Sequence, residues 1–143
     1  MLKEPRKTAA ASSDDMFEFV DIYPTLSDLT GLELPGHLEG LSLSPLVDDP
    51  TMEWKDYVIC KWFDGLTIKT RDYAYTEWSK SDAEVYARML YNHQRDEGEN
   101  FNISEDVDVQ SLILDLKQTM QENRGEDFNQ EIPGGKVREH VMF

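Results

Sequence analysis

The chain has 143 residues, the length of one domain, and 39% of them are hydrophobic, which permits one small core. Its 29 Asp and Glu residues outnumber 14 Lys and Arg residues, and the net charge of -15 opposes binding to nucleic acid and to anionic membranes. The single cysteine, Cys60, excludes an intramolecular disulfide and a cysteine-rich zinc site, and no apolar run approaches the ~20 residues of a membrane span.

Residues 1–13 are expected to form a disordered lead-in. They are polar and small, and they show no hydrophobic periodicity. The stretch contains basic residues but lacks the apolar centre of a secretory signal, so we expect no export signal in this chain.

A short helix is predicted over residues 21–31. Asp21 suits the N-cap, Pro24 falls in the first turn, where its missing N–H costs nothing, and Gly31 suits the C-terminal end. No neighbouring element in the sequence could cover the apolar face of this helix, which indicates a missing partner. Three residues form that face: Ile22, Leu26 and Leu29.

Residues 32–56 are predicted to form a loop, because proline and glycine recur too often for regular structure. The loop contains several leucines, which we expect to attach it to an apolar surface. These residues are Leu34, Leu38, Leu41, Leu43 and Leu46.

Four short runs of β-branched and aromatic residues follow, at residues 57–63, 66–70, 73–78 and 88–92. Asp64-Gly65 between the first two runs predicts a hairpin with a type I′ turn, which needs positive φ at both turn residues. Arg71-Asp72 separates the second run from the third. The runs therefore predict a small antiparallel meander.

An amphipathic helix is predicted from about Glu105 to Asn123, with Ser104 as its N-cap and Gly125 after its end. Its apolar stripe should pack on one face of the sheet. The predicted fold is therefore α+β, a four-stranded antiparallel sheet with one packed C-terminal helix, preceded by a helix-loop piece and followed by a tail at 126–143. The stripe consists of Val109, Leu112, Ile113, Leu116 and Met120.

The sequence contains few candidate catalytic or ligand-binding residues. It lacks a nucleophile elbow, a phosphate-binding glycine loop and a zinc-protease motif. Cys60 lies within a predicted strand and is expected to be a buried, inert thiol. Tyr73, Tyr75 and Trp78 could form a strip that stacks on carbohydrate, but ordinary packing between strands is the favoured interpretation.

Three ordered motifs resemble type I sulfatases. Residues 20–50, VDIYPTLSDLTGLELPGHLEGLSLSPLVDDP, resemble the segment near the end of that family's large domain. Residues 66–78, LTIKTRDYAYTEW, resemble its strand pair IRTxxYRYTEW, with Lys69 and Ala74 in place of the usual arginines. Residues 89–104, MLYNHQRDEGENFNIS, resemble its LYDHxxDPxENxNLA, with Glu97 in place of the common proline.

The resemblance is strongest to iduronate-2-sulfatase-like members. It implies the C-terminal part of a protein with the alkaline-phosphatase-like fold that hydrolyses sulfate esters, with a sulfated sugar as the expected substrate. Residues 14–56 would then be the end of the large α/β domain, 57–125 the small C-terminal subdomain, and 126–143 a tail. The missing N-terminal sulfatase domain is the implied partner.

The family's chemistry is implied to lie outside this chain. Its nucleophile is a formylglycine made from a C-x-P-S-R motif, whereas Cys60 is followed by Lys61, Trp62 and Phe63. Its calcium ligands and sulfate-binding residues also belong to earlier segments, so no catalytic or metal-binding residue is assigned here. The chain alone is expected to be inactive. Family members are usually exported to the periplasm, the cell exterior or the lysosome.

Loops of the small domain border the substrate cleft in this family, which implies a cleft-border role for Trp62, Asp64 and Trp78. The alternative is a stand-alone, non-catalytic module that binds a protein or a glycan. A monodisperse monomer that melts cooperatively would favour the module, and an aggregating or molten chain would favour the sulfatase part.

Overall fold

The computed structural model describes residues 12–80 and 84–123. The lead-in expected at residues 1–13 lies outside the described residues except for its last two, and the tail expected at 126–143 lies wholly outside them.

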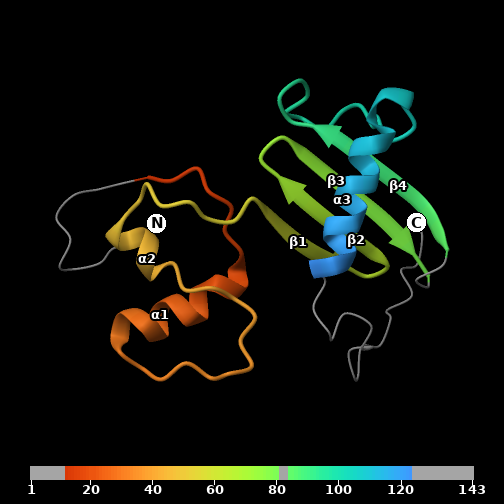
Figure 1. Cartoon of the computed structure of the whole chain (residues 1–143). Helices are drawn as coiled ribbons and strands as arrows, with labels where there is room; N and C mark the ends of the chain where they lie inside the picture. The colour runs from red at the N-terminus through yellow and green to blue at the C-terminus, as the bar shows by residue number, and fades with distance from the viewer. Residues whose placement is uncertain (1–11, 81–83, 124–143) are drawn as a thin grey trace, which may run out of the picture.

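The described chain forms a helix-loop unit followed by a four-stranded antiparallel sheet with a helix packed on it, which confirms the α+β prediction (Figure 1). The strands follow one another in the sheet in chain order. The helix-loop unit contains η1 (Phe19–Asp21), α1 (Ile22–Thr30) and α2 (Ser44–Asp48). The second part contains β1 (Tyr57–Trp62), β2 (Gly65–Thr70), β3 (Tyr73–Ser79), β4 (Val85–Asn92), η2 (Val107–Val109) and α3 (Gln110–Asn123).

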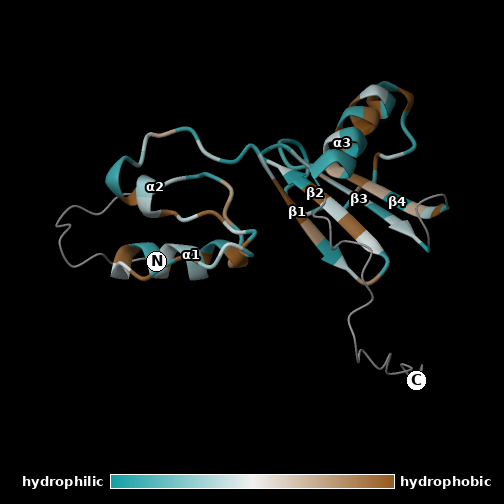
Figure 2. Cartoon of the chain, turned by 60° about the horizontal axis from the view of Figure 1, so that its bottom comes forward, coloured by the Kyte–Doolittle hydropathy of each residue, from teal (hydrophilic) through white to brown (hydrophobic). Residues whose placement is uncertain are grey.

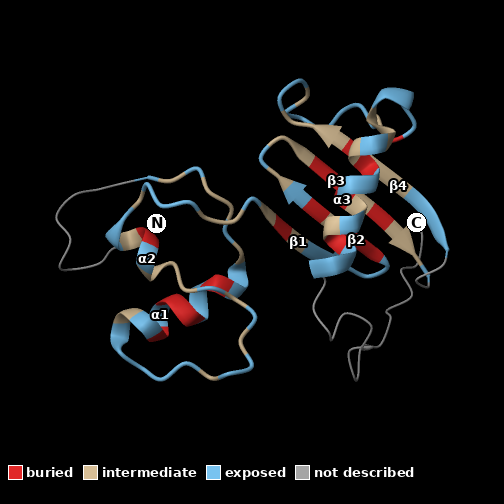
Figure 3. Ribbon diagram, in the orientation of Figure 1, coloured by how far each residue is buried: buried red, intermediate tan, exposed pale blue. Residues whose placement is uncertain are grey.

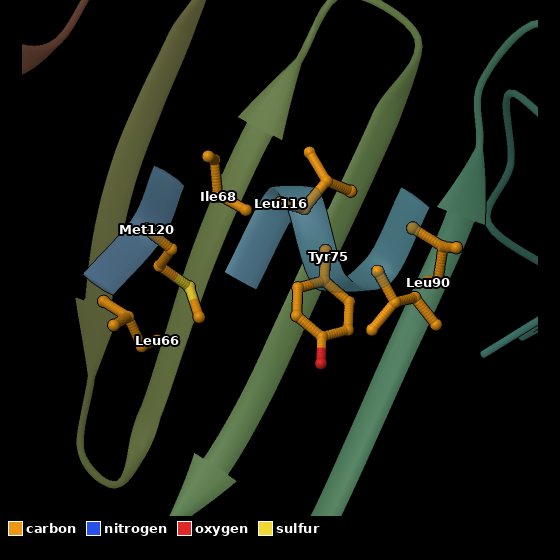
Figure 4. Packing of buried hydrophobic residues seen from close by; sticks show 7 residues of the cluster. Leu66, Ile68, Tyr75, Leu90, Leu116 and Met120 are labelled. Atoms are coloured by element: carbon orange, nitrogen blue, oxygen red, sulfur yellow. The ribbon is translucent and has the colours of Figure 1, made fainter. Parts of the chain in front are cut away.

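The core lies between the sheet and α3 (Figures 3 and 4). Ile68 pairs with Tyr75, and Tyr75 pairs with Leu90, so three neighbouring strands present one apolar row to the helix. The predicted stripe of α3 packs on this row, since Val109 and Leu112 are partly buried and the rest of the stripe is buried. The core cluster consists of Leu66, Ile68, Tyr75, Leu90, Ile113, Leu116 and Met120.

The first hairpin turns one residue earlier than predicted. Trp62 pairs with Gly65, so the turn residues are Phe63 and Asp64. Phe63 has a φ of 51°, whereas Asp64 and Gly65 do not have positive φ, and the type I′ prediction is therefore wrong. Gly65 serves a steric purpose instead, because a Cβ there would lie 2.8 Å from Nε1 of Trp78.

The C-terminal helix begins later than predicted. Residues 107–109 form the 3-10 turn η2, and α3 starts at Gln110. Ser104 is not the N-cap: it is buried, and its Oγ donates to the carbonyl of Arg88 at 3.2 Å. The hydroxyl that was expected to cap a helix therefore attaches the preceding loop to β4.

A buried carboxylate organises the helix-loop unit. The side chain of Asp21 is fully buried, and its oxygens accept from Nζ of Lys55 at 2.8 Å, from N of Leu41 at 2.9 Å and from N of Glu18 at 2.9 Å. Lys55 also pairs with Glu18 at 2.6 Å. Burial raises the pKa of Asp21, but these hydrogen bonds outweigh burial, and the pKa lies below its ordinary value.

The same helix turn positions the returning loop. Oγ1 of Thr25 donates to the carbonyl of Asp21 at 2.5 Å and accepts from N of Leu43 at 2.8 Å. A Cβ at Gly40 would clash with the carbonyl of Val20, so the loop passes η1 at a distance that only glycine permits. We call the contacts of Asp21, Thr25 and Lys55 the clasp.

Two expectations for residues 32–56 are wrong. The segment is not all loop, because α2 forms with a proline in its first turn. Among the five leucines only Leu46 is buried, and Leu34 and Leu41 are exposed. The backbone hydrogen bonds to the clasp hold this loop, so it does not need leucines packed on an apolar surface.

A second polar group links α3 to the sheet. Oε1 of Glu77, which is buried, accepts from the hydroxyl of Tyr75 at 2.6 Å and from Nζ of Lys117 at 2.8 Å. Burial and the neighbouring Glu77 carboxylate raise the pKa of Tyr75 above its usual range. The pair Glu77–Lys117 fixes where the helix lies along β3.

Replacing Lys55 with Met should loosen the clasp, because it leaves a buried carboxylate without its cation, at a cost of about 3 kcal/mol. We expect amide exchange at Leu41 to accelerate by about a hundredfold, measured by NMR. Lys69→Met, at an exposed lysine of β2, is the control and should leave this amide unchanged. Equal exchange rates in the two variants would contradict the role of the clasp.

Replacing Glu77 should separate its two functions. Glu77→Ala leaves the hydroxyl of Tyr75 without an acceptor and should cost about 2 kcal/mol, whereas Glu77→Gln keeps an acceptor and should cost about 1 kcal/mol. Urea unfolding followed by circular dichroism measures both. Glu105→Ala removes an exposed ion pair with Arg88 and should change the unfolding free energy little. A loss as large as that of Glu77→Ala would contradict this ranking.

Candidate functional site

An aromatic row crosses one end of the sheet. Trp62 pairs with Gly65, Gly65 pairs with Trp78, and Trp78 pairs with Ala87. Directly paired residues project from the same face, so both indoles lie on the face opposite α3, with the glycine between them. Figure 2 shows α3 on one side of the sheet and no described helix on the other. We call the two indoles of Trp62 and Trp78, together with Gly65 between them, the aromatic row.

The hairpin turn extends this row with an exposed ring. Trp62 is 76% exposed and Phe63 is 73% exposed, and their rings meet edge to face with centroids 4.9 Å apart. A positive φ is uncommon for a bulky residue, and strained backbone of this kind is found where structure serves function. The turn therefore holds a large apolar side chain in water.

Asp64 supplies the polar part of this end of the sheet. Its carbonyl accepts from N of Ser79 at 3.0 Å, which fixes the turn to the end of β3. Its Oδ2 lies 3.5 Å from the hydroxyl of Tyr86, whose pKa is raised by partial desolvation and by this carboxylate. Nζ of Lys80 lies 5.8 Å from the centre of the Tyr86 ring.

The structure therefore places Trp62, Asp64 and Trp78 at one end of the sheet, within two hairpins. Phe63 and Tyr86 belong to the same surface and were not predicted. The strip of Tyr73, Tyr75 and Trp78 does not form, because Tyr75 is in the core whereas Trp78 lies on the other face. The packing interpretation of Tyr75 is confirmed.

The side chains of this surface are chemically suited to binding a sugar. Aromatic rings beside a carboxylate suit a sugar, whose apolar face can stack on the rings while a hydroxyl donates to the carboxylate. Among residues 12–80 and 84–123, no group of three or more His, Cys, Asp or Glu residues could hold a metal ion.

Cys60 is exposed, so the prediction of a buried thiol is wrong. It lies on the edge strand β1, on the face that α3 does not cover. The residues after it do not form the formylglycine motif. The described residues thus fit neither a calcium site nor the family's nucleophile.

The third sulfatase-like motif, residues 89–104, stabilises the loop after β4. Asp96 accepts from Nδ2 of Asn100 and from N of Phe101, both at 2.8 Å, and its pKa is lowered by these two bonds. Oδ1 of Asn102 accepts from N of Leu90 at 3.0 Å. These contacts fold the loop after β4 and fasten it to the sheet, at the end opposite the aromatic row.

A hollow of about 390 Å³ lies between the start of the described chain, the segment before β1 and the β2–β3 turn. Acidic residues and the basic Lys55 and Arg71 line it, and Nε1 of the partly exposed Trp54 is buried without a partner. Its mixed charges favour no particular ligand. In the described residues, no helix is both long and apolar enough to cross a membrane.

Known proteins resemble this chain in sequence and in fold. Delta 4,5-hexuronate-2-O-sulfatase of Bacteroides thetaiotaomicron is 27% identical over 105 residues, covering 67% of this chain and 21% of the relative. A solved structure described with its substrate D-glucosamine-2-N,6-O-disulfate has a TM-score of 0.60 at 20% identity, covering 71% of this chain and 22% of that one. A phosphonate monoester hydrolase of Agrobacterium radiobacter has a TM-score of 0.58 at 22% identity, with 71% and 23% covered.

The two structural likenesses show the fold alone. The chain spans about a fifth of the length of the curated relative. A family model described as "N-sulphoglucosamine sulphohydrolase, C-terminal" matches residues 1–126, which confirms the resemblance to sulfatases. The chain belongs to this family of sulfatase C-terminal parts.

Proposed function

We propose that this chain acts as the C-terminal part of a sulfatase that hydrolyses a sulfate ester on a sugar, in the manner of iduronate-2-sulfatase-like members. The family match over residues 1–126 carries the proposal. The named activity of the hexuronate-2-O-sulfatase and the disulfated glucosamine substrate of the solved structure support a sulfated sugar as the substrate class.

Within such a protein, residues 14–56 would end the large α/β domain and residues 57–125 would form the small subdomain. Two observations support this division. The helix-loop unit is held by its own clasp, with little apolar burial, whereas the sheet and α3 share one core.

The -15 charge argues against nucleic acid as a partner.

The proposed part of this chain in the reaction is to bind and orient the sugar. Trp62 and Trp78 would stack on a sugar ring, and the Asp64 carboxylate would accept from a hydroxyl. The family implies calcium and a formylglycine nucleophile, and a larger part of the protein would hold both. We expect the whole protein to be exported, as members of the family usually are.

A stand-alone glycan-binding module is the second candidate. The exposed rings of Trp62 and Phe63 favour it, because a surface of this kind binds sugar without any catalytic group. We call the protein that the source cells make from this gene the native product. The two candidates differ in whether the native product hydrolyses a sulfate ester.

The test uses the native product, purified from its source cells with an antibody against this chain. We expect it to desulfate an unsaturated 2-O-sulfated hexuronate disaccharide. Trp62→Ala, introduced in the native gene, should raise KM for this disaccharide about tenfold by removing a stacking contact of about 1.4 kcal/mol. The KM for a small aryl sulfate should not change, because that substrate does not reach the row.

Phe101→Ala is the matched control, since Phe101 is an equally exposed aromatic residue at the opposite end of the sheet. Equal effects of the two variants would contradict the cleft-border role. A native product without turnover would contradict the sulfatase proposal, and disaccharide binding by that product would support the stand-alone module.

A further inference from the structure

Residues 102–104, Asn-Ile-Ser, are the chain's one match to the N-x-S/T pattern that accepts N-linked glycans in secreted proteins. We call these three residues the sequon. The sequon lies in the loop after β4, and Asn102 is exposed. Its position on the surface alone would leave the site open to glycosylation.

The sequon covers the outer edge of β4, which is the last strand of the sheet. N of Ile103 donates to the carbonyl of Leu90 at 3.0 Å, and Oδ1 of Asn102 accepts from N of Leu90 at 3.0 Å. Nδ2 of Asn102 and Oγ of Ser104 both donate to the carbonyl of Arg88 at 3.2 Å. The sequon thus satisfies backbone groups that an edge strand would otherwise leave unpaired.

This edge is attached to the core. Leu90 and Ser104 are both fully buried, and Leu90 pairs with Tyr75 within the core cluster. Ile103 is partly buried against the same cluster. Undocking of the sequon would therefore expose Ile103 and Ser104 and would loosen the strand that carries Leu90.

The side-chain amide of Asn102 faces β4 with both of its polar atoms. Oδ1 and Nδ2 each bond to the strand's backbone, so the hydrogen that Nδ2 donates to Arg88 lies on the Oδ1 side of the nitrogen. Glycosylation converts this side chain into a secondary amide, whose trans form places the sugar carbon on that same side. The sugar would therefore enter the space between Nδ2 and the carbonyl oxygen of Arg88, which are 3.2 Å apart.

We propose that Asn102 is a glycosylation site that folding closes. On the unfolded chain, an oligosaccharyltransferase joins Nδ2 to the first sugar of a lipid-pyrophosphate-linked oligosaccharide. The bond from the sugar's anomeric carbon to the pyrophosphate breaks, the pyrophosphate leaves with the electron pair, and the amide proton is lost to solvent. On the folded chain the amide is bound to β4 and does not react. A chain that receives the glycan first cannot dock the sequon, so glycosylation of Asn102 and folding of the sheet exclude each other.

Expression of the full chain behind a cleavable secretion signal in cultured mammalian cells tests this closure. Glycan occupancy of Asn102 is measured by mass spectrometry in the secreted protein and in the protein retained inside the cells. We expect Asn102 to be glycosylated in the retained protein and about tenfold less occupied in the secreted protein, the factor that one lost hydrogen bond of this kind implies. Urea unfolding followed by circular dichroism establishes whether the secreted protein is folded.

The double variant Glu99→Asn, Phe101→Thr is the matched control, because it adds a second sequon in the same loop. Glu99 has a φ of 52°, which asparagine tolerates, and its ion pair with His93 should contribute little. Residue 99 bonds to His93 and not to the β4 edge. The added site should therefore be occupied equally in the secreted and the retained protein.

Three results would overturn the proposal. One is a secreted, folded protein whose Asn102 is fully glycosylated. Another is the lack of glycan at Asn102 in both fractions, because the unfolded sequon would then not be a substrate. The third is a control variant whose added site is depleted in the secreted protein as strongly as Asn102, because the bonds to β4 would then not be the cause of protection.

Inhibiting synthesis of the lipid-linked oligosaccharide with tunicamycin supplies an independent check. Asn102→Asp removes the sequon but keeps acceptor oxygens for N of Leu90 and N of Ser104. We expect the inhibitor to raise the secreted yield of the unaltered chain several-fold relative to that of Asn102→Asp, since no chains are then trapped by a glycan. An equal response of the two chains would contradict the closure.

Discussion

The buried carboxylate of Asp21 is the constraint on which the first half of the structure depends. Removing this group from water costs several kcal/mol, and the folded chain offsets that cost only by bringing two backbone N–H groups and one lysine to it. These donors come from segments up to 34 residues away, so satisfying one charge fixes a helix, a loop and the entry to the sheet. The pKa of Asp21 below its ordinary value is the electrostatic consequence.

The motifs that identify the family are therefore mainly structural in this chain. Asp21 and Thr25 belong to the clasp, Gly40 allows the loop to pass close to η1, and Asn102 fastens the loop after β4. None of these groups faces the aromatic row. A strong sequence signature can thus specify how a domain is assembled.

The sequence predicts the elements whose signals are local. The sheet and the stripe of α3 follow from periodicity, and the C-terminal end of α1 follows from Gly31, which has a φ of 71°. Asp21 precedes α1 as predicted, but its side chain does not cap the helix and instead accepts from Leu41, Glu18 and Lys55. Features that depend on distant contacts were not predictable in this way. The first turn is shifted because Gly65 accommodates Trp78, and α3 starts late because Ser104 bonds to Arg88, sixteen residues away. Cys60 is exposed because no described helix covers its face of the sheet.

The aromatic surface was partly predictable for the same reason. Trp62, Asp64 and Trp78 flank short hairpins, so the sequence alone brings them to one end of the sheet. Phe63 and Tyr86 join them through the shifted turn and through the irregular register between Trp78 and Ser79, which no short pattern encodes.

The central claim is that these residues belong to a longer sulfatase whose chemistry lies elsewhere in the protein. Sequencing the transcript from the source cells upstream of the Met1 codon tests it most directly. The claim predicts an open frame, continuous with this one, that encodes a C-x-P-S-R motif and acidic metal ligands. A transcript with no such coding sequence upstream would contradict it and would leave the aromatic row as a binding surface of an independent domain.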